Sequence, residues 1–341
     1  MQPSASKLPN RRAIRQALSD WRAQDRLRAP TALATWRETE PRAADWRQWL
    51  DHALLALGAG LACAGVLVFF AFNWQDLHKF ARFGLLAGAI SLLAALAWWR
   101  PAGDLPGQAA LGGAQLLAGV LLAVIGQTYQ TGADAWQLFA LWALLAIPWA
   151  LAARAAPLWW LVIVVGNVAL LRYCSIRPGL GGALALLFDS QHARVVTLGL
   201  LGAALLQLAL WLALRATAPG LGFRGQTGAR LLGALACGYA GWAGLAALFG
   251  QRVNTSVLLL AALALVALGW WFRQRAFDIV ALSVVSLTGI VLAIATAGRV
   301  LFAGRFEYAS FLLLGLLTVG LATAAAMWLM RAYRTHTGEM A

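Results

Sequence analysis

The sequence predicts an all-α protein, a polytopic bundle of about ten transmembrane helices. Two observations lead to this fold class. Of the 341 residues, 61% are hydrophobic and only 12% are charged, whereas about a quarter of the residues of a soluble domain are charged. In addition, apolar runs of about 18 or more residues recur along the chain, and a helix of that length crosses the ~30 Å hydrocarbon core of a bilayer.

We expect ten spans. Their predicted boundaries are 52–73, 80–99, 109–126, 135–153, 157–173, 193–214, 229–249, 255–272, 276–297 and 308–330. The apolar stretch 179–188 is too short for a full span and suits a re-entrant or interfacial segment. Counts of nine or eleven spans therefore stay open.

The spans divide the chain into a basic N-terminal segment (1–51), a transmembrane domain (52–330) and a short tail (331–341). The N-terminal segment has helical character over 11–28 and no apolar core of a signal peptide. Two interpretations stay open for it, a basic amphipathic region on the cytoplasmic membrane surface and a solvated tail.

The Lys and Arg residues predict an orientation. With the N-terminus inside, 19 of the 27 fall on the cytoplasmic side, ten of them in 1–51, and eight fall on the other side. Because short cytoplasmic loops of membrane proteins carry an excess of these residues, we expect both termini in the cytoplasm.

Composition and motifs also argue against several function classes. The net charge of +14 does not indicate a nucleic-acid partner, because the arginines stand at span ends and no nucleic-acid-binding motif accompanies them. Cys63, Cys174 and Cys237 lie far apart, which predicts neither a disulfide framework nor a metal site. No hydrolase, metalloprotease or nucleotide-binding motif is present. We therefore expect a protein that is not an enzyme, with no catalytic residues and no cofactor.

The middle of every predicted span lacks Asp, Glu, Lys, Arg and His. This argues against an ion-coupled pump, since intramembrane charges usually mark such pathways. The neutral polar residues Gln115, Asn167 and Gln207 are expected to form hydrogen bonds between helices. Asp278, near the start of a span, is expected to reach the interface or cap a helix.

Tryptophan residues gather near the predicted span ends. Their ring is apolar and their N–H needs a partner, so Trp prefers the membrane interface. We interpret nine of them as interfacial anchors rather than as a ligand cage: Trp74, Trp98, Trp99, Trp136, Trp159, Trp160, Trp270, Trp271 and Trp328.

Three polar seams interrupt the apolar pattern, and all three are predicted on the non-cytoplasmic side. The first is Asn73-Trp74-Gln75. The second is GQTYQTGADAW at 126–136, where Gly132 allows a tight turn and Asp134 can cap the next helix, and the third is Gly250-Gln251. A capped interfacial turn explains each seam. The functional alternative is a cluster that binds a ligand or partner, for which the candidate residues are Asn73, Trp74, Gln75, Gln127, Tyr129, Gln130, Thr131, Asp134 and Gln251.

The second seam also belongs to an internal echo. In 119–154 and in 244–275, an apolar span is followed by Gly-Gln, a short polar turn with Thr, and an Ala/Leu-rich span that ends in Arg; 65–100 is a fainter third copy. Parallel hairpin repeats occur in transporters, but Ala/Leu-rich spans also resemble one another by composition alone.

The runs GVLVFFAFNWQDLHKFARFGLLAG and GQTYQTGADAWQLFALWALLAIPWALAAR resemble bacterial multi-pass membrane proteins of domain-of-unknown-function family 2157. The resemblance covers roughly 10–175. It implies a location in a bacterial inner (plasma) membrane and a multi-pass architecture, and it carries over no catalytic residues.

Three function hypotheses follow. The favoured one is a non-enzymatic inner-membrane scaffold subunit, with the lipid bilayer and a membrane or periplasmic protein as partners. The second is a transporter or lipid translocator that uses a polar cavity on the non-cytoplasmic side. The third is a membrane-embedded enzyme that uses a loop carboxylate such as Asp76 or Asp134.

Overall fold

The computed structural model describes most of the chain after residue 77. The described ranges are 78–100, 103–129, 132, 134–174, 190–249, 253–302 and 308–337, with separate positions between 46 and 68. The chain divides into two compact units, one made of Leu55–Ala322 and the other of Met1–Leu54 with Thr323–Ala341. The following paragraphs concern the Leu55–Ala322 unit.

The described elements are helices. They are α4 (Lys79–Trp98), α5 (Leu105–Tyr129), α6 (Ala135–Ala153), α7 (Ala156–Cys174), α9 (Ser190–Thr217), the 3₁₀ turn η1 (Pro219–Leu221), α10 (Thr227–Leu248), α11 (Thr255–Gln274), α12 (Ile279–Leu301) and α13 (Tyr308–Thr337). Among the described residues, nine helices are long and apolar enough to cross a membrane.

These nine helices correspond one to one with the predicted spans from 80–99 onward, which confirms the all-α polytopic fold class. The first predicted span, 52–73, and the 179–188 stretch fall largely or wholly outside the described residues. The total of ten spans therefore stays a prediction.

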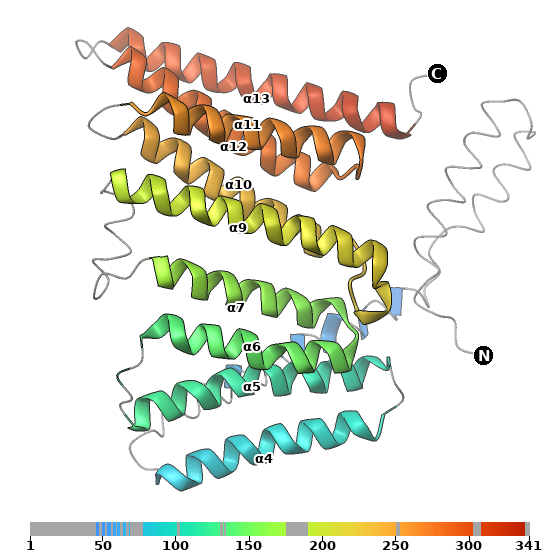
Figure 1. Ribbon diagram of the computed structural model, residues 1–341. Coiled ribbons are helices and arrows are strands. Elements are labelled where there is room, and N and C mark those ends of the chain that lie inside the picture. Colours follow the sequence, from blue (N-terminus) through green and yellow to red (C-terminus); the bar gives the residue numbers. More distant parts are fainter. Residues whose placement is uncertain are drawn as a thin grey trace, which may run out of the picture. The chain divides into compact units, whose positions relative to one another are not determined.

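Successive helices connect at alternate ends, as Figure 1 shows. The turns after α4, α6, α9 and α11 lie at one end, which we call the Arg154 end after the residue that ends α6. The C-terminal ends of α5, α7 and α10 lie at the opposite end, which we call the Tyr129 end. This alternation is the arrangement that the predicted topology requires.

Helix α10 is the centre of packing, with α7, α9, α11 and α12 around it. Two thirds of its span, 67%, is buried. Small residues explain this burial: a Cβ added at Gly241 would lie 2.9 Å from Thr288, and one at Gly244 would lie 2.6 Å from Leu292, both on α12. Lipid tails are as apolar as Leu, so close backbone approach at small residues is a main source of helix association in membranes.

The structure supports the hairpin repeat only in part. The ends of α5 and α10 lie on the same side, as the repeat predicts (Figure 1). However, α5 continues through Gly126 and Gln127 to Tyr129, whereas α10 ends at Leu248, before the second Gly-Gln. The first Gly-Gln thus lies in the last turn of its helix, at the predicted outer end, whereas the second follows its helix along the chain.

Candidate functional site

Three of the nine candidate contact residues lie among the described residues. Gln127, Tyr129 and Asp134 gather where α5 ends and α6 begins, and all three are exposed. We call these three residues the hairpin surface. The other candidates lie outside the described residues: Asn73, Trp74, Gln75, Gln130, Thr131 and Gln251.

Tyr129 is the most firmly positioned member of the hairpin surface. Its ring stacks on Phe83 of α4, with the ring centroids 5.9 Å apart and the planes 9° from parallel. Tyr129 is still 55% exposed. A neighbouring helix therefore holds the ring while most of it stays accessible.

Asp134 stands at the N-cap of α6 in extended conformation, as predicted, but its side chain makes no capping hydrogen bond. Asp134 thus stands at the predicted N-cap position, but the predicted capping hydrogen bond from its carboxylate is wrong. Gly132 has φ +64°, which confirms the tight turn that glycine allows. The Asp134 carboxylate is therefore not used to cap α6.

Inside the bundle, Gln115 connects three helices. Its buried side chain donates from Nε2 to the carbonyls of Ala146 on α6 (3.1 Å) and Leu158 on α7 (3.2 Å). Trp142 of α6 returns a bond from Nε1 to the Gln115 carbonyl at 3.0 Å. The prediction that Gln115 bonds between helices is confirmed.

Asn167 and Gln207 form the second interhelical pair. The Asn167 Nδ2 on α7 donates to the Gln207 Oε1 on α9 at 2.8 Å and to the Ile163 carbonyl at 2.9 Å. Both amides had been predicted to serve this role. The pair links α7 to α9, which otherwise pack lightly against each other.

Beside this pair, α7, α9 and α10 enclose an open cavity of about 260 Å³. We call it the α7–α9 groove. Its lining is almost wholly apolar and includes Trp159, Ile163 and Leu170 of α7, and Trp211 of α9, with Gln207 as its amide. The groove does not include Gln127 or Tyr129, so it is not the polar cavity that the translocator hypothesis requires.

The loop after α9 (218–226), which we call the closing loop, folds back and lines the groove at the Arg154 end. Phe223, only 5% exposed, stacks on Trp159 at 4.6 Å and meets Trp211 edge-on at 5.2 Å. The Trp159 Nε1 donates to the Leu221 carbonyl at 2.8 Å. Trp159 thus packs on this loop, and its predicted place at the membrane interface stays a prediction.

A close approach fixes where the loop lies. Gly222 has φ +98°, and a Cβ there would come within 2.7 Å of the Arg154 carbonyl carbon. Only glycine combines this backbone conformation with so short a contact. The loop therefore packs directly on the turn between α6 and α7.

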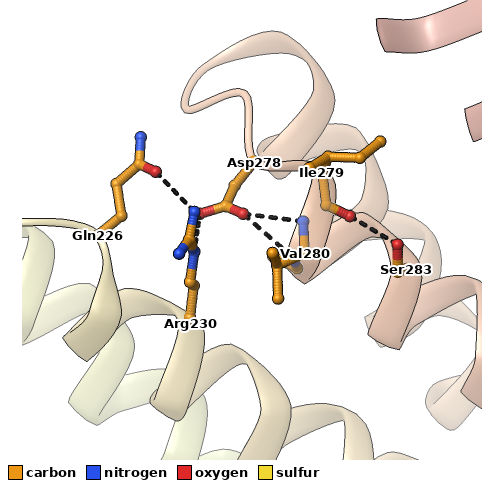
Figure 2. Close-up of polar contacts among 7 residues, drawn as sticks. Gln226, Arg230, Asp278, Ile279, Val280 and Ser283 are labelled. Carbon is orange, nitrogen blue, oxygen red and sulfur yellow. Dashed lines mark hydrogen bonds and ion pairs between the residues drawn. The ribbon is translucent and has the colours of Figure 1, made fainter. Parts of the chain in front are cut away.

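An ion pair joins α10 to α12, also at the Arg154 end (Figure 2). The Arg230 Nε donates to the Asp278 Oδ2 at 2.6 Å, while the Asp278 Oδ1 accepts from the backbone N–H groups of Val280 and Ala281. Gln226 accepts a further bond from Arg230 Nη2 at 3.1 Å. The predicted helix cap at Asp278 is confirmed.

Sequence reasoning missed the Arg230 partner and the closing loop. A lone carboxylate at the start of an apolar span was a usable signal, because such a group needs a counter-charge or hydrogen bonds. Nothing in the sequence marks Phe223 as more than a loop aromatic, since its contacts come from helices that are distant along the chain.

The described helices define a polytopic α-helical membrane protein. Residues 19–159 match a family model whose description reads "Predicted membrane protein (DUF2157)", a domain of unknown function. The matched stretch contains both motifs that carry the resemblance, which is thereby confirmed. No curated protein and no solved structure matches the chain.

Proposed function

We propose that this protein is a non-catalytic subunit of a bacterial inner membrane, with its N-terminus in the cytoplasm, and that its hairpin surface binds a partner protein. The observation that carries this proposal is the exposure of three neighbouring polar residues, Gln127, Tyr129 and Asp134. All three are exposed at the Tyr129 end, and the Asp134 side chain does not cap its own helix.

The chemistry of the hairpin surface suits protein recognition. Tyrosine is enriched among the residues that dominate binding energy, and a ring already fixed by its neighbour loses little entropy on binding. Phe83 provides that support for Tyr129. An amide and a carboxylate beside the ring supply directional hydrogen bonds. The partner we propose is a membrane-anchored or periplasmic protein that offers donors to Asp134.

The basic residues at the described turns support one orientation of the protein in the membrane. Arg100, Arg154, Arg224 and Arg275 lie at turns of the Arg154 end. The excess of basic residues in cytoplasmic loops supports placing this end in the cytoplasm. The hairpin surface then faces the periplasm.

Site-specific photo-crosslinking in cells tests the proposal. A photoreactive amino acid is placed at Gln127, and in a separate variant at Trp99, which is 82% exposed at the other end of α4. We expect a discrete crosslinked protein from position 127 that is lost when Tyr129→Ala or Asp134→Asn is added, and no such product from position 99. Adducts with lipid alone, or a product unaffected by these substitutions, would refute partner binding.

A further inference from the structure

We propose that the α7–α9 groove is a binding site for one anionic phospholipid, with an acyl chain along α7 and the phosphate at the Arg154 end. This inference shares with the proposed function only the orientation of the protein in the membrane, because it concerns different residues at the opposite end of the helices. It rests on the dimensions and apolar lining of the groove and on the arginines at the Arg154 end.

The groove has the dimensions of a hydrocarbon chain in one leaflet. Its α7 wall runs from Trp159 to Leu170, roughly 16 Å at about 1.5 Å per residue. That is about half of the ~30 Å hydrocarbon core. The volume of about 260 Å³ lies just below the roughly 300–1,000 Å³ of pockets for drug-sized ligands. A single chain fits this space better than a bulky polar solute.

Polar side chains recur along one face of α9. Gln207, Trp211 and Arg215 are spaced four residues apart, so they lie on one face of the helix, with Arg215 nearest the Arg154 end. Gln207 is already bonded to Asn167. Trp211 is 3% exposed, and its Nε1 has no hydrogen-bond partner among the described residues.

The Trp211 Nε1 atom is itself buried, and the neighbouring ring carbon lies against Gly228 of α10. This edge of the indole therefore packs between α9 and α10. Arg215, one turn further along α9, is the side chain placed to meet a phosphate.

Three arginines stand next to groove residues or to the closing loop at the Arg154 end. Arg154 ends α6, Arg215 lies in the last turn of α9, and Arg224 follows Phe223 in the closing loop. Of the described carboxylates, the two at this end have other partners: Asp104 pairs with Arg100, and Asp278 pairs with Arg230. The uncompensated positive charge matches an anionic headgroup, and basic sites between transmembrane helices bind such headgroups.

The test titrates the purified full-length protein in detergent with phosphatidylglycerol or phosphatidylcholine and counts bound lipids by native mass spectrometry. We expect saturable binding of one phosphatidylglycerol, weaker binding of phosphatidylcholine, and a loss of the preference at high salt. Equal binding of the two lipids would overturn the proposal.

Variants locate the headgroup. Arg215→Gln is expected to weaken phosphatidylglycerol binding about fivefold, while Arg215→Lys retains most of the affinity. Arg275→Gln is the matched control, because it removes one charge at the end of α11, away from the groove. An equal effect of Arg215→Gln and Arg275→Gln would show unspecific surface attraction and refute the site.

A second pair of variants locates the acyl chain. Leu210 lines the groove, whereas Leu206, one turn away and 71% exposed, does not. Leu210→Trp is expected to abolish retention of the lipid, and Leu206→Trp to leave it unchanged. If Leu210→Trp fails to fold, Leu170→Trp on the opposite wall, with Val164→Trp as its control, makes the same comparison. Undiminished lipid retention in a folded groove-filling variant contradicts the proposal.

Discussion

Asp278 uses its two carboxylate oxygens for two separate tasks. Oδ1 caps α12 by accepting from Val280 and Ala281, and Oδ2 accepts from Arg230 of α10. The carboxylate is 4% exposed and Arg230 is 38% exposed. A desolvated charge next to a partly hydrated one makes the pair sensitive to loss of the carboxylate, because Asp278 has little access to water.

Asparagine and alanine substitutions separate these two tasks. In Asp278→Asn, the amide oxygen can still cap α12, but the amide N–H₂ faces the Arg230 N–H. We expect a loss of about 2 kcal/mol in the free energy of unfolding. Asp278→Ala also removes the cap, which adds about 1 kcal/mol. Unfolding in mixed micelles with increasing denaturant measures both values.

Asp104 is the control for this prediction. Its ion pair with Arg100 is longer, 3.8 Å, and the two side chains are 33% and 47% exposed. Asp104→Asn should therefore cost less than about 1 kcal/mol. If Asp104→Asn destabilises the protein as much as Asp278→Asn does, burial of the Asp278 carboxylate is not the reason for the loss of stability.

At this scale, the sequence predicts what a buried polar group needs but not which residue supplies it. Gln115, Asn167 and Gln207 could be assigned to interhelical bonding because an amide in hydrocarbon must find a partner. The identity of the partners depends on helix order and rotation. For the same reason, the Asp278 cap was predictable, since it is local, and the Arg230 pair was not.

At the scale of elements, α5 and α6 pack through one glycine. A Cβ at Gly119 would lie 2.2 Å from the Trp142 ring, which the hydrogen bond to the Gln115 carbonyl holds in place. A rigid indole cannot move aside as a leucine tip can. We expect Gly119→Ala to cost about 1–3 kcal/mol of stability, measured as a lower thermal unfolding midpoint in detergent.

Gly126, also on α5, is the control position for Gly119. No atom lies within 4 Å of a Cβ added there, and alanine favours a helix over glycine by roughly 0.5–1 kcal/mol. Gly126→Ala should thus be neutral or slightly stabilising. Equal destabilisation by the two substitutions would show that the contact with Trp142 is not decisive.

The closing loop is the second element whose packing can be tested. Phe223 fills the space between Trp159 and Trp211, so Phe223→Ala should cost about 3 kcal/mol. Hydrogen exchange should rise in 218–226 before the rest of the chain is affected. Leu221→Ala, at a 39% exposed position of the same loop, should cost about 0.5 kcal/mol or less. A similar rise in exchange for both variants contradicts the role of Phe223.

Hydropathy located the described helices well, because the length of each apolar run is set by membrane thickness. It missed the last turn of α5, since Gln127 and Tyr129 are polar enough to resemble a loop. Helix hydrogen bonding continues there because it satisfies backbone groups regardless of side-chain polarity. The hairpin surface was predicted as a cluster, but the Phe83 contact that fixes Tyr129 depends on how α4 and α5 pack.

At the scale of the whole molecule, burial is uneven among the helices. The central helix α10 is 67% buried over its span, whereas α4 is 6% buried. A helix that is apolar all round and little buried needs lipid or another helix on its free side. We therefore expect the exposed sides of helices such as α4 to contact lipid or another helix. The interhelical polar contacts lie elsewhere, at Gln115, at Asn167 with Gln207, and at Arg230 with Asp278.

Which end faces the cytoplasm can be decided by cysteine accessibility. In a chain with Cys63, Cys174 and Cys237 replaced by Ser, a single cysteine is introduced at Asp134 or at Gln226, both exposed and at opposite ends. Because the positive-inside bias places the Arg154 end in the cytoplasm, a membrane-impermeant maleimide should label Asp134→Cys in intact spheroplasts and Gln226→Cys only after lysis.

The reverse labelling pattern would invert the assigned orientation and move the hairpin surface to the cytoplasm. It would also place the three arginines at the Arg154 end in the outer leaflet, where the anionic surface potential of the cytoplasmic face does not act. Labelling of both positions before lysis would contradict the alternation of helix ends, since three described helices, α6, α7 and α9, lie between the two sites along the chain. One experiment thus tests the shared premise of the partner surface and the lipid site, while the variants at each site distinguish between them.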